Sequence, residues 1–380
     1  MRKENARLKM TRLGLRIRYR GDMAKRKRTP STPNISPDFM REKEKMMNAA
    51  QKALRDMKID SPEEANAFLS QFVGMHMADV TKALGGDATD DLEEQANEMF
   101  FEAMESRTRF AAKRKLAAVL KLDPGHVRAL TALAMMESSP AKIETALRTA
   151  ILAGERRLGP LLQEGHGELW GFLEARPYME ARAELAEFLA GQEGRQDDAI
   201  REHQELLRLN ENDNQGIRDT LLALLLETRR FDDARALVKK YDTDHAATWM
   251  YSKALLAFEQ HAAAARWDTT SHDQAWLERQ MHGMAAGMVP DIPKPVRKAD
   301  KALIKALKFN PWCAIYLFKT GEHLDDELPE YYSAGTEEEA LLFVGHHANA
   351  WVKNPSALLW LMLTAMPWLI KNGYEAEIEP

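Results

Sequence analysis

Apolar side chains recur every three or four positions along nearly all of the chain after a proline-rich N-terminal segment. This spacing places them on one side of an α-helix. Ala, Leu, Glu, Arg and Met dominate these stretches, and β-branched residues are thin. Start signals for helices recur as well: "SPEE" at 61–64 has the order of a capping box, and Asp90 with Glu93 and Thr336 with Glu339 repeat its spacing. The pattern predicts an all-α protein.

The expected helices carry the marks of a degenerate repeat. Three of them end alike, in "AVLKLDPGH" at 118–126, "ELLRLNEND" at 205–213 and "KALKFNPWC" at 305–313. A small residue lies twelve positions ahead of the turn residue in each, namely Ala112, Ala199 and Ala299. Ala199 and Ala234 are 35 residues apart, close to the 34-residue tetratricopeptide period. One helical pair cannot bury its apolar stripe alone, so we expect stacked pairs.

These signals divide the chain into four parts. We predict a basic disordered tail at 1–37, N-terminal helices at 38–90, a degenerate tetratricopeptide-like repeat domain at 91–353, and a capping helix with a tail at 354–380. The repeat domain contains expected pairs at about 91–125, 127–153, 178–212, 215–241 and 246–309, an irregular unit at 312–353, and insertions at about 154–177 and 262–295. The predicted fold is an all-α, right-handed helical-repeat solenoid with two insertions and a C-terminal capping helix.

The most polar short segment, "NENDNQG" at 210–216, falls at an expected joint between two repeats. Asn and Asp are favoured there because they cap helices and tolerate tight turns. We expect Asp213 or Asn214 to cap the helix that follows, and we interpret the segment as structural. Arg218 remains as a candidate for recognition, since it lies one turn into that helix beside polar neighbours.

Several longer strings resemble one group of bacterial tetratricopeptide-like proteins that is similar to the suppression-of-tumorigenicity-seven family. They include "LGPLLQEGHGELWGFLEARPYMEAR", "LLRLNENDNQGIRDTLLALLLE" and "ATWMYSKALLAF", and the resemblance covers roughly residues 90–360. It implies a helical-repeat scaffold that binds other proteins. The sequence departs from the family at 210–213, where Asn-Glu-Asn-Asp replaces Asn-Pro-Asn-Asp, and it lacks the membrane spans of the animal members.

Charge is distributed unevenly along the chain. Residues 1–28 carry twelve Lys or Arg against two acidic residues, a net charge of about +10, whereas the whole chain carries −5. The first interpretation of this tail is a solvated, disordered extension, with Met23 as an alternative start of the chain. A second is a weak electrostatic contact with nucleic acid or anionic lipid. A third is an organelle transit peptide, because the tail is rich in Arg and poor in acid.

Compartment and membrane signals are few. One cysteine, Cys313, excludes an internal disulfide and is typical of a reducing compartment, so we expect a cytoplasmic protein. The longest apolar run, at 357–370, has 14 residues, fewer than the roughly 20 that a bilayer requires. We therefore expect a buried helix there and no membrane span. No apolar segment follows the basic start, so we expect no secretory signal.

Candidate catalytic and metal-binding motifs are weak. His346 and His347 are adjacent on an expected helix, so their side chains diverge and do not readily share one ion. His272 and His282 lie in the second insertion without an HExxH or CxxC motif. Cys313 follows a tryptophan and is expected to be a packed thiol. We predict no enzyme activity, no metal and no cofactor; an enzyme with its site in the insertions is the alternative.

Recognition of a peptide or protein is better supported. Arg together with aromatic residues is the chemistry of interface hot spots, and two Arg on consecutive first helices suit a bidentate contact to a carboxylate. The candidate partner-binding residues are Arg176, Tyr178, Arg182, Asn214, Arg218, Trp249 and Tyr251. The alternative for each is a structural role, with the Arg in internal salt bridges to Glu180, Glu184 or Asp219 and the aromatic residues in the core.

The sequence thus predicts a non-catalytic helical-repeat scaffold that binds a protein or peptide partner. The alternative is a nucleic-acid-associated protein that uses the basic tail at 1–28, with the repeats as a second contact.

Overall fold

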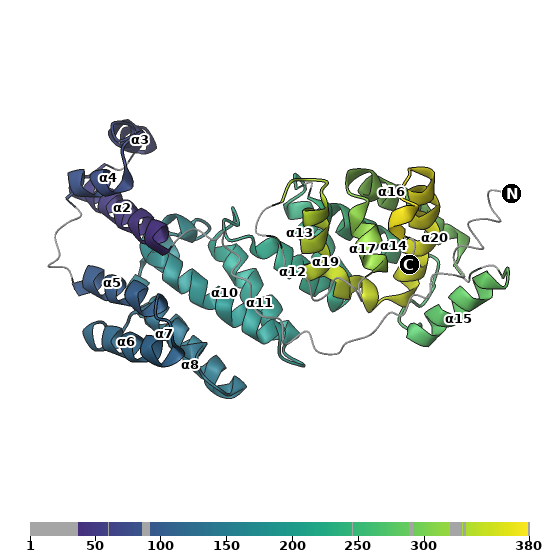
Figure 1. The fold of residues 1–380 in the computed structure, drawn as a ribbon, viewed down its shortest axis with the longest axis horizontal. Coiled ribbons are helices and arrows are strands. Elements are labelled where there is room, and N and C mark those ends of the chain that lie inside the picture. The colour runs from purple at the N-terminus through teal and green to yellow at the C-terminus, as the bar shows by residue number, and fades with distance from the viewer. Residues whose placement is uncertain are drawn as a thin grey trace. The chain divides into compact units, whose positions relative to one another are not determined.

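The computed structural model describes residues 37–59, 61–85, 92–244, 246–288, 290, 292–319, 329 and 332–378. Apart from one isolated β-bridge, the regular structure in these ranges is helical (Figure 1), which confirms the all-α prediction. The basic tail, with its predicted disorder and nucleic-acid contact, lies outside the described residues, as does the expected cap at Asp90.

The described chain divides into two compact units, residues 37–217 and 218–378, and each is considered by itself. The division falls directly after the polar segment 210–216, at the first residue of α12 (Ile217–Glu227). Asp213 has a φ of 52°, and its carboxylate accepts a hydrogen bond of 2.7 Å from the backbone N–H of Ile217. Of the two expected caps, Asp213 is therefore the one that accepts a hydrogen bond from a backbone N–H at the start of α12, while Asn214 is exposed.

The first unit is built from helices of two to five turns and a few short helical turns. They are α2 (Pro37–Asp56), α3 (Pro62–Ser70), α4 (Met77–Ala83), α5 (Leu92–Met104), α6 (Arg109–Leu122), α7 (Val127–Ala134), α8 (Pro140–Leu158), α9 (Leu161–Glu164), η2 (Leu169–Gly171), η3 (Leu173–Ala175), α10 (Arg176–Ala190) and α11 (Gln196–Leu209). Ser61 caps α3 as expected, by accepting from the N–H of Glu64 at 3.1 Å.

Three helical hairpins form the body of the first unit. α5 packs on α6, α7 on α8, and α10 on α11, and each hairpin is closed by a short loop, so its helices are antiparallel. α10 also packs on α7 and α8, and α7 on α6, so each hairpin covers part of the one before it. These helices match the pairs expected at 91–125, 127–153 and 178–212.

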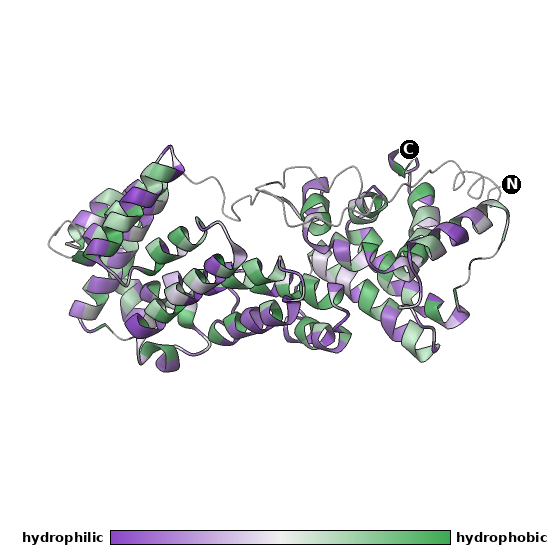
Figure 2. Ribbon diagram, turned by 90° about the horizontal axis from the view of Figure 1, so that it is seen from below, coloured by the Kyte–Doolittle hydropathy of each residue, from purple (hydrophilic) through white to green (hydrophobic). Residues whose placement is uncertain are grey.

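Small residues permit the close contacts within and between the hairpins. The alanines ahead of the three repeated endings, Ala112, Ala199 and Ala299, are all below 7% exposed, and so is Ala234, which lies 35 residues after Ala199. Figure 2 shows hydrophobic and hydrophilic residues alternating along most helices, as amphipathic packing requires. α8 continues to Leu158, past the expected start of the first insertion at 154, because Gly154 is a packing position inside the helix.

The second unit contains α12 and a further set of helices around an aromatic core. They are α13 (Phe231–Lys240), α14 (Ala247–Ala264), α15 (Gln274–Ala285), η4 (Lys294–Ala299), α16 (Asp300–Phe309), α17 (Trp312–Phe318), α19 (Glu337–Val352), α20 (Pro355–Lys371) and η5 (Ala376–Ile378). α14 packs on α16, and α17 on α19. α20 coincides with the expected final helix and packs against α16 and α19. Among the helices described, none has the length and apolar content needed to cross a bilayer.

Aromatic rings fill the core of the second unit. Tyr251 lies 5.1 Å from Phe343 between ring centroids, and Phe258 stacks on Trp360 at 5.0 Å. The Tyr251 hydroxyl donates to the backbone carbonyl of Asn310 at 2.7 Å. Such large buried rings carry much of the apolar burial in a unit of this size.

A buried carboxylate joins three segments of this unit. Glu339, on α19, accepts from the N–H of Ala247 at 2.9 Å, from the Asn310 side-chain amide at 2.9 Å, and from the N–H of Gly335 at 2.7 Å. Its side chain is 4% exposed. Glu339 thereby satisfies a donor at the start of α14 and another at the end of α16, which water does not reach.

We expect Glu339→Ala to destabilise the second unit by about 3 kcal/mol, because it leaves three donors without an acceptor. Tryptophan fluorescence during urea denaturation reports mainly the unfolding of this unit, since Trp170 is the one tryptophan of the chain outside it. Lys305→Ala, at an exposed position of α16 in the same unit, is the matched control and should change stability by less than about 0.5 kcal/mol. Equal unfolding curves for the two variants would contradict this assignment.

Candidate functional site

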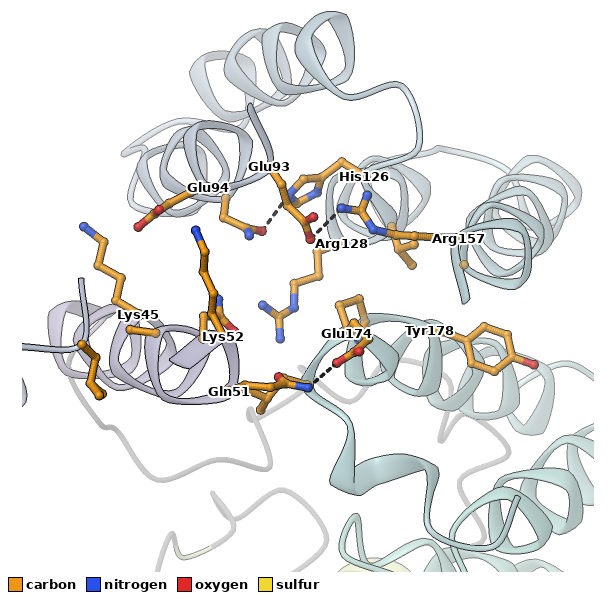
Figure 3. Close-up of a pocket in the computed structure, with 18 of the residues that line it drawn as sticks. Lys45, Gln51, Lys52, Glu93, Glu94, His126, Arg128, Arg157, Glu174 and Tyr178 are labelled. Carbon is orange, nitrogen blue, oxygen red and sulfur yellow. Dashed lines mark hydrogen bonds and ion pairs between the residues drawn. The ribbon is translucent and has the colours of Figure 1, made fainter. Parts of the chain in front are cut away.

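The first unit contains a cavity of about 420 Å³ between α2 and the beginnings of three later helices (Figure 3). We call it the first-unit cavity. Its lining residues are Lys45, Asn48, Ala49, Gln51, Lys52 and Asp56 from α2, Leu84 and Gly85 after α4, Glu93, Glu94 and Asn97 from α5, His126, Val127 and Arg128 at the start of α7, Gly154 and Arg157 from α8, and Leu173, Glu174, Pro177 and Tyr178 around the start of α10. The first helices of three consecutive hairpins thus contribute to one hollow.

The local sequence explains why polar groups gather there. α5, α7 and α10 each present their first turn to the cavity, and the first turns of helices favour acidic and hydrogen-bonding residues. Glu93 and Glu94 occupy the first turn of α5. His126 occupies the cap position of α7, where its Nδ1 accepts from the N–H of Ala129 at 3.2 Å. The same register in successive hairpins therefore supplies the wall of the cavity.

Several charges in the wall already have partners. Arg128 donates to both carboxylate oxygens of Glu180, at 2.9 and 3.2 Å. Arg157 pairs with Glu93 at 2.6 Å and with Asp123 at 2.9 Å. These fixed pairs hold the wall in shape and leave less charge for a ligand.

Other charges lack such partners. Lys52 and Glu94 form no hydrogen bond or ion pair within the part of the chain that the structure describes. Figure 3 shows the Lys52 side chain extending from α2 across the cavity toward α5 and the Arg128 guanidinium pointing into the space between α2 and α7. Lys52 and Glu94 are therefore available to a ligand that enters the cavity, whereas Arg128 is held by Glu180.

His126 is fixed as a neutral structural group. Its Nε2 lies 3.0 Å from Asn97 Oδ1, while Nδ1 accepts from a backbone N–H, so the tautomer has its proton on Nε2. Burial lowers the pKa of His126 from 6.5 to about 4. Both ring nitrogens are thus occupied by structural hydrogen bonds.

Two of the predicted partner-binding residues, Tyr178 and Arg182, come together one turn apart on α10. The Arg182 guanidinium lies 5.4 Å from the centroid of the Tyr178 ring and pairs with Glu202 at 3.1 Å. A second cavity of about 400 Å³ adjoins them, lined also by Glu155, His166 and Arg208. Tyr178 is 3% exposed and contributes to the walls of both cavities.

A close helix contact fixes the position of Tyr178. A Cβ atom placed on Gly154 of α8 would lie 2.9 Å from the Cβ of Tyr178 and 3.0 Å from its ring. No side chain larger than hydrogen fits there without displacing α10. Gly154 therefore sets the separation of α8 and α10 at the edge of the first-unit cavity.

Arg176 and Arg218 make internal contacts, whereas Asn214 is exposed. Arg176 begins α10, donates to the Trp170 carbonyl at 3.1 Å and lies over the Trp170 ring. In the second unit, Arg218 pairs with Asp244 at 2.9 Å and lies over the Tyr241 ring.

The two aromatic candidates of the second unit lie in its core. Trp249 is buried and donates to Asp219 at 2.8 Å, and Tyr251 is buried beside Phe343. Fully buried rings are not available to a partner in this conformation, so these contacts favour the structural alternative for Trp249 and Tyr251.

Apart from Tyr178, the residues that line the first-unit cavity were not among the candidates predicted from the sequence. Lys52, Glu94, Asn97, His126 and Arg128 were missed because each is unremarkable alone. The signal that could have found them is their shared register: charged or hydrogen-bonding residues recur in the first turns of the expected first helices.

Metal-binding and nucleophilic candidates have structural surroundings. Within the described ranges, no group of three or more His, Cys, Asp or Glu is arranged to hold a metal ion. The His272 ring stacks on the Trp276 ring with 3.9 Å between centroids, and its Nδ1 lies 2.6 Å from the Ser356 hydroxyl in a hydrogen bond. Cys313 is buried in α17, and burial raises the pKa of its thiol well above the usual range. The expectation of no metal stays a prediction.

Comparison of the chain with protein-family models, with curated proteins and with solved structures gives no significant match. The family resemblance drawn from the sequence strings therefore stays an expectation.

The pKa of His126 predicts a pH dependence of the first unit. The pKa of His126 in the folded unit, about 4, lies below the ordinary 6.5. Neutral His126 therefore stabilises the folded unit fully above pH 6.5, and this stabilisation is lost as the pH falls toward 4. From pH 7 to pH 5 the loss is about 2 kcal/mol. Hydrogen exchange of α5 and α7 should show this loss in the wild type and a smaller one in His126→Asn, whose side chain also caps a helix. Identical pH profiles would contradict the role given to His126.

The close contact at Gly154 gives a second prediction. We expect Gly154→Ala to destabilise α8 and α10 by about 1–2 kcal/mol, because the added methyl group overpacks against Tyr178. Gly171→Ala is the control, since a Cβ atom there has no neighbour within 4 Å. Hydrogen exchange of peptides from the two helices measures the effect. Unchanged protection in Gly154→Ala would show that α10 does not depend on this contact.

Proposed function

We propose that the protein is a non-catalytic scaffold that binds a protein or peptide partner, with the first-unit cavity as the binding surface. We propose further that the helical hairpins of each unit are degenerate tetratricopeptide-like repeats of a right-handed solenoid. The single cysteine supports a cytoplasmic location.

The observation that carries the proposal is the way the cavity is assembled. Its wall crosses α5, α7 and α10, the first helices of three consecutive hairpins. A surface built from successive repeats suits an extended or helical segment that contacts several repeats at once. A compact metabolite would contact fewer of them.

The lining also supports recognition more than catalysis. Fixed ion pairs, such as Arg128 with Glu180, give the wall a stable shape, while Lys52 and Glu94 supply charges of both signs that a polypeptide can meet. The imidazole of His126, the natural general base in such a site, has both nitrogens occupied and a pKa of about 4. A group held in this way caps a helix and does not transfer protons at neutral pH.

The test uses the full chain as bait in a lysate of the source cells, read by mass spectrometry. The cavity variant carries Lys52→Glu and Glu94→Lys, which keep the net charge and break no hydrogen bond or ion pair of the described residues. We expect recovery of a specific partner to fall at least tenfold with this variant.

The matched control carries Lys43→Glu and Glu105→Lys, at exposed positions outside the lining. It should recover the partner as the wild type does. Equal recovery by all three baits, or no specific protein with any bait, would remove the first-unit cavity as the binding surface.

A further inference from the structure

The helix α2 lies along one side of the first-unit cavity and meets the opposite side mainly through charged and polar groups. Lys45 pairs with Glu98 of α5 at 2.6 Å, and Arg41 pairs with the same carboxylate. Near the other end of the helix, Gln51 donates to Glu174 at 2.7 Å. Arg41 and Lys45 are four residues apart, and Lys52 lies seven beyond, so all three share one face of α2.

The opposing wall is acidic where α2 crosses it. Glu94 and Glu98 lie one turn apart on α5, and Glu94 lines the cavity beside Lys52 (Figure 3). A basic helical face therefore lies against an acidic one. This complementarity is the relation expected between a groove and a helical ligand.

The contact between α2 and this wall is incomplete. Ala49 is the one fully buried side chain among those described on α2, and the cavity of about 420 Å³ remains between the helix and the wall. The ion pairs with Glu98 are about a quarter to two-fifths exposed at each side chain. Partly exposed pairs of this kind stabilise weakly and are screened by salt. α5 and α6, in contrast, share a closed core of Ala96, Phe100, Leu116 and their neighbours.

Resting on the proposed function, we propose that α2 is a displaceable occupant of the first-unit cavity, and that the external ligand is a basic amphipathic helix of a partner protein. The partner helix carries Arg or Lys at positions i and i+4 that replace Arg41 and Lys45 at Glu98. A third basic residue, seven positions further on, pairs with Glu94, which lines the cavity beside Lys52 without pairing with it. Apolar residues of the partner fill the volume that α2 leaves empty.

Occupancy by α2 lowers the apparent affinity for the partner. A ligand that competes with a tethered segment binds only the fraction of molecules in which the segment has moved away. Weakening the attachment of α2 should therefore strengthen binding of an added helix. Raising the salt concentration should weaken both the internal and the external contact.

The test measures binding of a fluorescein-labelled synthetic peptide, residues 37–58 of this chain, to the full-length protein by fluorescence anisotropy. The opened variant carries Arg41→Glu and Lys45→Glu, which repel Glu98. The control carries Lys43→Glu and Lys58→Glu, the same change in charge at exposed positions outside the cavity lining. We expect the peptide to bind the opened variant at least tenfold more tightly than it binds the wild type or the control.

A charge reversal in the wall completes the design. Adding Glu98→Lys to the opened variant should weaken binding of the wild-type peptide at least tenfold. A peptide that carries Arg41→Glu and Lys45→Glu should bind this triple variant better than the wild-type peptide does. Glu105→Lys in the opened variant is the control for the wall and should leave binding unchanged.

Three results would overturn the inference. The peptide could fail to bind the opened variant, or it could bind wild type, control and opened chains equally. The opened variant could also lose its helical circular dichroism or its cooperative unfolding, which would show that α2 is a required part of the fold. A cavity-dependent partner recovered from lysate, together with failure of the peptide, would keep the proposed function and remove this inference alone.

Discussion

Each helical hairpin leaves one apolar face that the next hairpin has to cover, and this requirement fixes where the first turns of α5, α7 and α10 lie. α10 meets both α7 and α8, and it can do so because Gly154 lets the Tyr178 ring approach the backbone of α8. With that separation set, Pro177 and Tyr178 stand beside the first turns of α5 and α7. The cavity is thus a product of packing, and its polar lining follows from the preference of helix starts for charged and hydrogen-bonding side chains.

The two units use buried polar groups for the same purpose. In the first unit, neutral His126 caps α7 and reaches Asn97 on α5, so that one imidazole ties two hairpins together. In the second unit, Glu339 links the start of α14 to the end of α16, and the buried carboxylate of Glu259 accepts from Asn354 and Thr269 near the second insertion. Burial raises the pKa of Glu259, and the Arg229 charge opposes that effect. These groups specify which helices meet, while apolar burial supplies most of the stability.

Much of the fold could be predicted from the sequence, because helix periodicity, caps and alanine spacing are local signals. The caps at Ser61 and Thr336 and the buried alanines Ala112 and Ala199 are where the pattern placed them. The cavity could not be predicted in the same way. Its wall combines α2 with helices far along the chain, and the spacing of residues within one helix gives no information about such a contact.

The sequence also could not show which of the candidate residues are exposed to a partner and which are buried. Arg with a neighbouring aromatic residue is common to interfaces and to internal packing, and only the surroundings distinguish the two. Arg182 lies over the Tyr178 ring beside two cavities, and its role in binding stays a prediction, whereas Trp249 and Tyr251 lie in the core of the second unit. Lys52 and Glu94, two charges of the cavity lining that have no partner among the described residues, are the better candidates for recognition, and a tertiary structure was needed to find them.

The central claim is that a partner polypeptide enters the first-unit cavity, and site-specific photo-crosslinking in living cells tests it most directly. A photoreactive amino acid is placed at position 94 of α5, in the lining, and separately at position 105, an exposed position just beyond α5 and outside the lining. The account predicts one protein adduct at position 94 that is weak or missing at position 105. Adducts of equal yield at both positions, or none at position 94, would contradict it.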